Sequence, residues 1–337
     1  MPEIRKTIEE LTELVATVLV SHNASEDNAR QVAIALIAAE VEGQKGHGVS
    51  RVASYSAQAK SGKVNGFAIP EVIKVADAAI RVDAKHGFAF PAFSAAIETL
   101  TDLASNKGIA AAVITQSHHC GMLGYHAEKL AQKGLIALVF SNSPKAIAPW
   151  GGNQAVFGTN PIAFAAPRAN SEPLVIDLSL SKVARGKVKM AYENNQSIPE
   201  GWALDKDGKT TTDAAAALSG TMVPMGEGKG SALVLMVEIL AAALSASHFG
   251  FEASSFFTAD GPAPDIGQLM IAISPGPLSA NLYFNRIEAL IAAILGQEGT
   301  RLPGSARAEK WEEARANGIK IGDQLFSNLL KLRNNPL

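Results

Sequence analysis

The sequence predicts a mixed α/β fold with helical ends and a strand-rich centre. Thr7 and Glu10 have the spacing of a capping box and precede apolar residues at helical spacing. From Gly108 the pattern changes to strand, turn, helix and strand. Further on, short apolar runs alternate with Gly- and Pro-rich segments, which is typical of sheet strands joined by loops.

The first hundred residues are expected to be mainly helical. Ser25 to Asp27 are residue types that begin helices, and they open a second helix that ends near Gly43. A third, short helix runs to Lys60 and is stopped by Gly62. Alternating β-branched residues between Glu71 and Val82 predict strands.

The centre is expected to build most of the sheet. Strands are predicted over residues 109–115 and 135–142, with a helix from Leu123 to Gln132 between them. The runs IAFAAP and LVIDLS are two further strands. The polar stretch from Asn194 to Thr212 is expected to be a loop.

The C-terminal third returns to helices. The segment GEGKG (226–230) is expected to precede a long apolar helix, and residues 268–274 form another strand. A helix follows from Leu282 to Leu295, and RLPGSARAEK is a loop that leads into a final helical tail.

Composition limits the classes of protein that this chain can be. With 47% hydrophobic and 18% charged residues, the chain of 337 residues can bury a large core. A net charge of -2 without basic runs gives no reason to expect nucleic acid as a partner. The most apolar segment, Ser231 to Ser247, carries Glu238 at its centre, which favours a buried helix over a membrane span.

The single cysteine and the N-terminus bear on the compartment. Cys120 cannot form an intrachain disulfide or a thiolate zinc site, which fits a reducing compartment. The first fifteen residues have no basic stretch followed by an apolar one, so no secretory signal is expected. We therefore expect a soluble, cytoplasmic protein.

Two local motifs each allow a functional and a structural interpretation. The glycines of GEGKG free backbone N–H groups and Lys229 adds a charge, as in a phosphate cradle, although a plain turn before a helix has the same pattern. His118 and His119 suggest a metal site, but adjacent side chains point in different directions and no H-E-x-x-H spacing exists. We expect no metal and place both histidines on a turn that lines a pocket.

The segment GHGVSR is the most informative local motif. His47 lies between two glycines, where the backbone can approach a ligand closely. Arg51 follows four residues later, so in a helix the two side chains share a face. An imidazole beside a guanidinium suits proton donation to a substrate whose carboxylate is bound. A surface histidine and a solvated arginine would show the same local pattern.

Longer segments carry a resemblance to a known family. In chain order they are GHGVSRVASYSAQAKSGKVNG, SHHCGMLGYHAE, SNSPKAIAPWGG, FGTNPIAFAAP, VIDLSLSKVARGK, IPEGWALD and RLPGSARAEK, from about Glu40 to Lys310. Together they resemble the malate/L-lactate dehydrogenase type 2 family. Within it the chain is most similar to the branch of Δ1-piperideine-2-carboxylate/Δ1-pyrroline-2-carboxylate reductases.

The resemblance implies an architecture. It is a non-Rossmann nicotinamide-binding fold with a large sheet and helices from both termini, assembled as a homodimer. The implied division has an N-terminal helical part (1–105), a sheet-rich cofactor- and substrate-binding domain (106–275) and a C-terminal helical part (276–337) that completes the first. No G-x-G-x-x-G follows a strand in this sequence.

The resemblance also implies roles for individual residues. His47 is the proton donor, Arg51 binds the substrate carboxylate and Thr159 contacts the substrate. The implied cofactor contacts are His119, Cys120, Gly121, Met122, Leu123, Asp177, Leu178, Ser179, Arg185, Gly186, Lys229, Gly304, Ser305, Ala306, Arg307, Ala308, Glu309 and Lys310. Two positions depart from many relatives, because Gly46 stands where they have serine and Lys187 where some reductases have an acidic residue.

Four functions remain open at this point. The first is reduction of cyclic imino acids by NADPH, with NADH as the other possible cofactor. The second keeps the same fold and uses a 2-hydroxy acid of the malate, lactate or sulfolactate type. The third is a metal-dependent hydrolase built on His118 and His119, and the fourth is a binding protein without catalysis.

Overall fold

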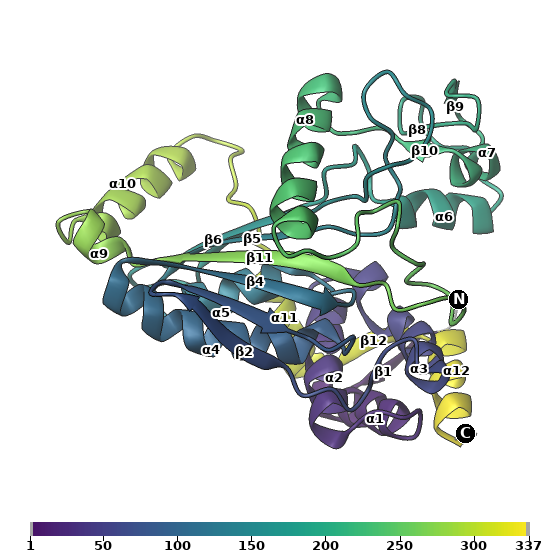
Figure 1. The fold of residues 1–337 in the computed structure, drawn as a ribbon, viewed down its shortest axis with the longest axis horizontal. Coiled ribbons are helices and arrows are strands. Elements are labelled where there is room, and N and C mark those ends of the chain that lie inside the picture. Colours follow the sequence, from purple (N-terminus) through teal and green to yellow (C-terminus); the bar gives the residue numbers. More distant parts are fainter. Residues whose placement is uncertain (1–2, 335–337) are drawn as a thin grey trace.

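A seven-stranded sheet forms the centre of the computed structural model, which describes residues 3–334 (Figure 1). The strand order is β2-β3-β4-β11-β5-β6-β7. The β3–β4 pair is parallel, and every other neighbouring pair in this sheet is antiparallel. The strands are β2 (Glu71–Ala76), β3 (Ala79–Asp83), β4 (Ile109–Ser117), β5 (Ile136–Ser141), β6 (Ile162–Ala166), β7 (Leu174–Leu178) and β11 (Ile266–Ile273).

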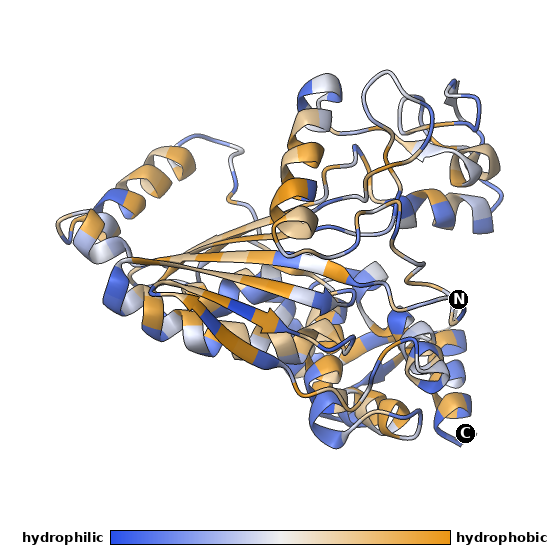
Figure 2. Cartoon of the chain, in the orientation of Figure 1, coloured by the Kyte–Doolittle hydropathy of each residue, from blue (hydrophilic) through white to orange (hydrophobic). Residues whose placement is uncertain are grey.

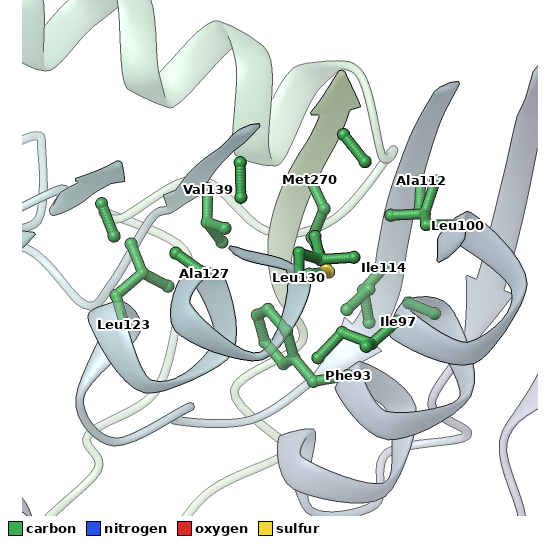
Figure 3. Packing of buried hydrophobic residues seen from close by; sticks show 14 of the residues in the cluster. Phe93, Ile97, Leu100, Ala112, Ile114, Leu123, Ala127, Leu130, Val139 and Met270 are labelled. Atoms are coloured by element: carbon green, nitrogen blue, oxygen red, sulfur yellow. The ribbon is translucent and has the colours of Figure 1, made fainter. Parts of the chain in front are cut away.

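Helices α4 (Ala89–Lys107) and α5 (Leu123–Ala131) cover one face of this sheet. Their apolar residues meet alternate side chains of the strands, as the two-residue period of a strand requires. Phe93, Leu130, Ile114 and Met270 are all buried in this core (Figure 3). Helix α4 was not anticipated from the sequence.

The other face of the sheet carries a smaller lobe with its own core. Its elements are α6 (Arg185–Glu193), β8 (Ala203–Leu204), β9 (Thr210–Thr211), α7 (Ala214–Ser219), β10 (Thr221–Met222), α8 (Glu227–Glu238) and the π-helical turn η3 (Ile239–Ala243). Strands β8, β9 and β10 form a three-stranded sheet, so the expectation of a plain loop from Asn194 to Thr212 was wrong. GEGKG does not precede α8 either, because the helix already begins at Glu227.

The two ends of the chain pack together as a helical body. It contains β1 (Glu3–Lys6), α1 (Ile8–Val20), α2 (Glu26–Val41), η1 (Lys45–His47), η2 (Val49–Arg51), α3 (Val52–Ser61), α11 (Arg307–Asn317), β12 (Ile319–Gly322) and α12 (Asp323–Asn334). The capping box of Thr7 and Glu10 is confirmed, with both of its hydrogen bonds present. The C-terminal tail is not one helix, because β12 interrupts it to pair with β1. RLPGSARAEK is a loop only as far as Ala306, and α11 begins at Arg307.

Helices α9 (Pro275–Leu278) and α10 (Tyr283–Leu295) project away from the sheet (Figure 1). Their surface is strongly apolar (Figure 2), with Leu278 70% and Leu290 61% exposed. Among residues 3–334, no helix combines the length and the hydrophobicity needed to span a bilayer. An exposed apolar arm of this kind is typical of a surface that binds another protein.

Candidate active site

The turn that carries His47 is held by a buried carboxylate. Glu40, at the end of α2, accepts a hydrogen bond of 3.0 Å from the backbone N–H of Val49. A Cβ atom at Gly48 would lie 2.3 Å from Glu40 Oε2, so a side chain here would displace that carboxylate from its bond to Val49. A Cβ atom at Gly46 would meet nothing within 4 Å. The segment forms two short 3₁₀ turns rather than the single helix that the spacing of His47 and Arg51 suggested.

His47 and Arg51 each keep buried polar atoms without a partner. The His47 ring stacks on His119, with centroids 5.3 Å apart and planes 9° from parallel. Its Nδ1 atom and the Nη1 atom of Arg51 are buried and have no hydrogen-bond partner among the described residues. Arg51 donates from Nε to the carbonyl of Gly46 at 2.7 Å. Buried polar groups of this kind are normally satisfied, so these atoms are available to a ligand.

The site favours a neutral imidazole beside a charged guanidinium. Burial, followed by the positive charge of Arg51, lowers the pKa of His47 to about 4. Burial and the same neighbour lower the pKa of His119 well below its usual value. Near neutral pH both rings are therefore uncharged, while Arg51 retains its proton.

Tyr55 is a site residue that sequence analysis missed. Its hydroxyl lies 2.5 Å from His119 Nδ1, and its side chain is fully buried. The sequence spacing could have indicated Tyr55, because it follows Arg51 by four residues and therefore by about one helical turn. His118 is also engaged, since its Nε2 lies 2.7 Å from Gln58 Oε1. Within the described part of the chain, no three side chains of the metal-binding types converge.

Two aromatic residues close the site from another part of the chain. The ring of Phe256 lies 5.0 Å from that of His119. The guanidinium of Arg51 lies 4.5 Å from the centre of the Phe257 ring, a cation–π distance. Both phenylalanines precede β11, and local sequence gives no indication that they meet residues as far away in the chain as His119 and Arg51.

The predicted cofactor residues from 119 to 123 lie in the turn between β4 and α5, and Asp177 joins them. Asp177, at the end of β7, accepts a hydrogen bond of 2.7 Å from the backbone N–H of Gly124 in the first turn of α5. Burial raises its pKa to about 6. The carbonyl of Cys120 in the same turn accepts a hydrogen bond from His126 Nε2 at 2.9 Å. The N-terminus of α5 is thus occupied by a carboxylate of the chain itself.

The predicted segment from Gly304 to Lys310 lies against the same region. Arg307 forms a bidentate ion pair with Glu42, with both distances 2.8 Å, and a further ion pair with Glu128 of α5. Lys310 donates to the carbonyl of Glu42 at 2.7 Å. The guanidinium of Arg307 is therefore bound by two carboxylates. Its neighbours Ser305, Ala306, Ala308 and Glu309 are exposed.

The other predicted residues lie on separate elements. Thr159 hydrogen-bonds to Ser143, on the loop before β6. Leu178 and Ser179 end β7 and lead to Arg185 and Gly186, which begin α6. Lys229 lies in the first turn of α8, and the opposite end of that helix leads into η3 beside the sheet. The structure does not bring Lys229 next to His47 within one chain.

Comparisons with known proteins place this geometry in a family. The model of the malate/L-lactate dehydrogenase family matches residues 7–330. The chain belongs to this family. It is therefore an oxidoreductase, as the motifs from GHGVSR to RLPGSARAEK indicated.

Individual relatives differ in the reactions that their names state. The chain is 54% identical to (2R)-3-sulfolactate dehydrogenase (NADP(+)) of Chromohalobacter salexigens, over 83% of each chain. It is 39% identical to the Δ1-pyrroline-2-carboxylate/Δ1-piperideine-2-carboxylate reductase of Pseudomonas putida, over 98% of this chain and 97% of that one. The crystal structure of Δ1-piperideine-2-carboxylate reductase from Pseudomonas syringae pvar. tomato has a TM-score of 0.92 at 38% identity and covers 98% and 99% of the two chains.

The contact between Gly48 and Glu40 generates a first prediction. Gly48→Ala forces a Cβ atom onto Glu40 and should destabilise the fold by about 1–3 kcal/mol, the usual cost of overpacking. Gly46→Ala is the matched control, because the added methyl group meets open space and stability should stay within about 0.5 kcal/mol of wild type. Urea unfolding measures both variants. Equal stability of the two would contradict the role of Glu40.

The low pKa of His47 generates a second prediction. Since burial and Arg51 disfavour the protonated ring, the His47 imidazole should stay neutral as the pH falls from 8 to 5 and gain its proton with a midpoint near 4. Titration by NMR measures this, with the resonance assigned by its loss in His47→Asn. A midpoint near that of a solvated histidine, about 6.5, would show that the ring is not shielded as described.

Proposed function

We propose that the chain is an NADP-linked oxidoreductase that acts at carbon 2 of a small carboxylate-bearing substrate. The observation that carries the proposal is the Arg51 guanidinium, whose buried Nη1 atom has no partner among the described residues, beside the neutral imidazole of His47. A guanidinium binds a carboxylate through two parallel N–H bonds. A nearby imidazole can then exchange a proton with the atom bonded to carbon 2.

The residues present suit a nicotinamide cofactor, and the NADP+ in the name of the sulfolactate dehydrogenase relative supports NADPH rather than NADH. Helix α6 begins without a side-chain cap, and a Cβ atom at Gly186 would meet nothing within 4 Å. Free backbone N–H groups at such a helix start suit a phosphate. We assign phosphate binding to this turn, with Arg185 beside it, and the rest of the cofactor to the turn 119–123, the end of β7 and residues 304–310. The mainly antiparallel sheet supports a binding mode unlike that of parallel doubly wound folds.

The chemistry divides between the cofactor and the chain. NADPH supplies the hydride when it is bound. Arg51 holds the substrate carboxylate, and this offsets the smaller of the two causes that lower the pKa of His47, the larger being burial. The carboxylate thus makes it easier for the His47 imidazole to take up the proton that it donates to the substrate. Phe256 excludes water from the side of the His119 ring that it covers, and Phe257 does the same for the Arg51 guanidinium.

We place a 2-oxo or 2-hydroxy acid first among substrates. Lys189 of α6 lies 5.7 Å from the centre of the Phe257 ring that Arg51 also contacts. Two cations beside one ring complement a substrate with a second anionic group, and they oppose a protonated imine, whose nitrogen is positive. The 54% identity with a sulfolactate dehydrogenase supports the same order. A cyclic imino acid, which the sequence resemblance favours, is the second candidate, supported by reductase relatives along almost the whole chain.

We further propose that the functional unit is a homodimer. Exposed apolar side chains gather on α8 and α10, with Leu235 48% and Leu290 61% exposed (Figure 2). One concave surface lies beside α1 and α12, and another lies beside α6 and α7. Neither is lined by His47 or Arg51. A second copy covering α10 would bury these side chains. Sedimentation of the wild type as a dimer and of Leu290→Asp as a monomer is the expected result.

The proposed reaction is tested by a panel of substrates. NADPH and NADH oxidation is followed with 2-oxo acids that carry one or two anionic groups and with both cyclic imino acids. We expect turnover with NADPH and a 2-oxo acid that has a second anionic group. His47→Ala should lower kcat by about 10²-fold or more and leave the KM for NADPH unchanged. Preference for the imines would reverse the order of the two candidates, and no turnover of any acid would contradict the proposal.

The role of Arg51 gives a sharper prediction. Arg51→Lys keeps the charge but loses the planar pair of donors, so kcat/KM for the acid should fall by about 10²-fold. A substrate analogue without the carboxylate should react poorly with the wild type and equally poorly with the variant. This comparison is a double-mutant cycle with the ligand as one partner. If both substrates lose the same factor, Arg51 does not bind the carboxylate.

A further inference from the structure

The segment 249–265, which we call the strap, connects the end of η3 with β11 and carries Phe256 and Phe257. Its two ends are held together, because the N–H of His248 donates to the carbonyl of Asp265 at 2.8 Å. Near its start, the N–H of Gly250 donates to the buried carboxylate of Glu238 at 2.7 Å. The strap is thus a compact loop with closed ends, a type of loop that is often functional.

The two phenylalanines of the strap differ in their surroundings. Phe256 is 6% exposed and packs on the rings of His118 and His119. Phe257 is 58% exposed, yet one face of its ring is covered by the guanidinium of Arg51. The strap thus contributes to the position of the Arg51 guanidinium, together with the bond from Arg51 Nε to the carbonyl of Gly46.

Lys63 holds the strap at the position of these two rings. It lies two residues after α3 and is only 4% exposed. Its ammonium donates to three backbone carbonyls of the strap, those of Ser255 at 2.7 Å, Thr258 at 3.1 Å and Asp260 at 2.8 Å. The hydroxyl of Ser61 adds a bond of 3.1 Å to the carbonyl of Ala259. The acceptors flank Phe256 and Phe257 on both sides.

This arrangement is unusual for a buried lysine. Buried ammonium groups normally pair with a carboxylate, whereas all three protons of Lys63 go to carbonyl groups of one loop. Hydrogen bonds from a charged donor are stronger than neutral ones, and three that converge fix the loop in both position and orientation. Helix α3 carries Tyr55 and begins at Val52, directly after Arg51, so one element connects the strap to the site.

We propose that Lys63 is a positioning residue for the substrate carboxylate. By fixing the strap it holds the Phe257 ring against Arg51, and the guanidinium is thereby oriented before the substrate arrives. The inference rests on the proposed function in one respect, that Arg51 binds the carboxylate. Its effect acts through Phe257, whose ring contacts Arg51 and Lys189.

The test compares Lys63→Met with Lys60→Met. Methionine keeps the apolar stem of Lys63 and removes its three donors, while Lys60 is exposed in the last turn of α3. In Lys63→Met the KM for the acid substrate should rise about tenfold, with the KM for NADPH and kcat changed by less than about threefold. Chymotrypsin should cleave the variant after Phe257 faster than the wild type. Lys60→Met should match the wild type in both measurements.

Ser61→Ala provides the milder variant. It removes one bond to the strap and should shift both measurements in the same direction by a smaller factor, so it decides the question if Lys63→Met does not fold. Cleavage no faster than in the wild type overturns the proposal, and so does faster cleavage with an unchanged substrate KM. Equal rises in the KM for substrate and for NADPH also overturn it. If the wild type turns over no carboxylate substrate, the proposed function fails and this inference fails with it. If the wild type turns over the substrate normally and Lys63→Met behaves like the wild type, only this inference fails.

Discussion

The antiparallel pairing of β11 with β4 is the constraint on which the site depends. Ile266, the first residue of β11, is the register partner of Ser117, the last residue of β4. The end of the strap is therefore placed beside the turn that holds His118 and His119. Gln268 secures the same junction by donating to the carbonyl of His118 at 3.3 Å. A shift of this pair by one residue would turn alternate side chains to the wrong face of the sheet and separate the strap from the two histidines.

The charges around this junction are left unbalanced. The Arg51 guanidinium lies among aromatic side chains together with the neutral rings of His47, His118, His119 and His126. Buried polar atoms of His47 and Arg51 have no hydrogen-bond partner among the described residues. Unpaired polar groups that are buried cost free energy of folding. A bound carboxylate would supply the missing acceptors and the missing negative charge together. A carboxylate ligand would thus complete both the hydrogen bonds and the charge balance of the site.

Local sequence patterns predicted those features that depend on neighbours in the chain. The capping box of Thr7, the stop at Gly62 and the strands on either side of α5 follow from periods of two and 3.6 residues. The insertion of β11 between β4 and β5 has no such signal, because it depends on register between distant segments. The partners of Lys63 are backbone carbonyls, which every residue has, and the carboxylates around Arg307 belong to helices far away in the sequence.

The pairing of β1 with β12 has a consequence for how the chain is made. Glu3 to Lys6 find their partners only in residues 319–322, so β1 can pair only after β12 has been synthesised. Helices α1 and α2 emerge early with apolar faces that α11 and α12 later cover. Synthesis proceeds at about 5–20 residues per second, so these faces stay open for tens of seconds. During that interval these faces are open to aggregation, and the complete helical body can form only after α12 has been synthesised.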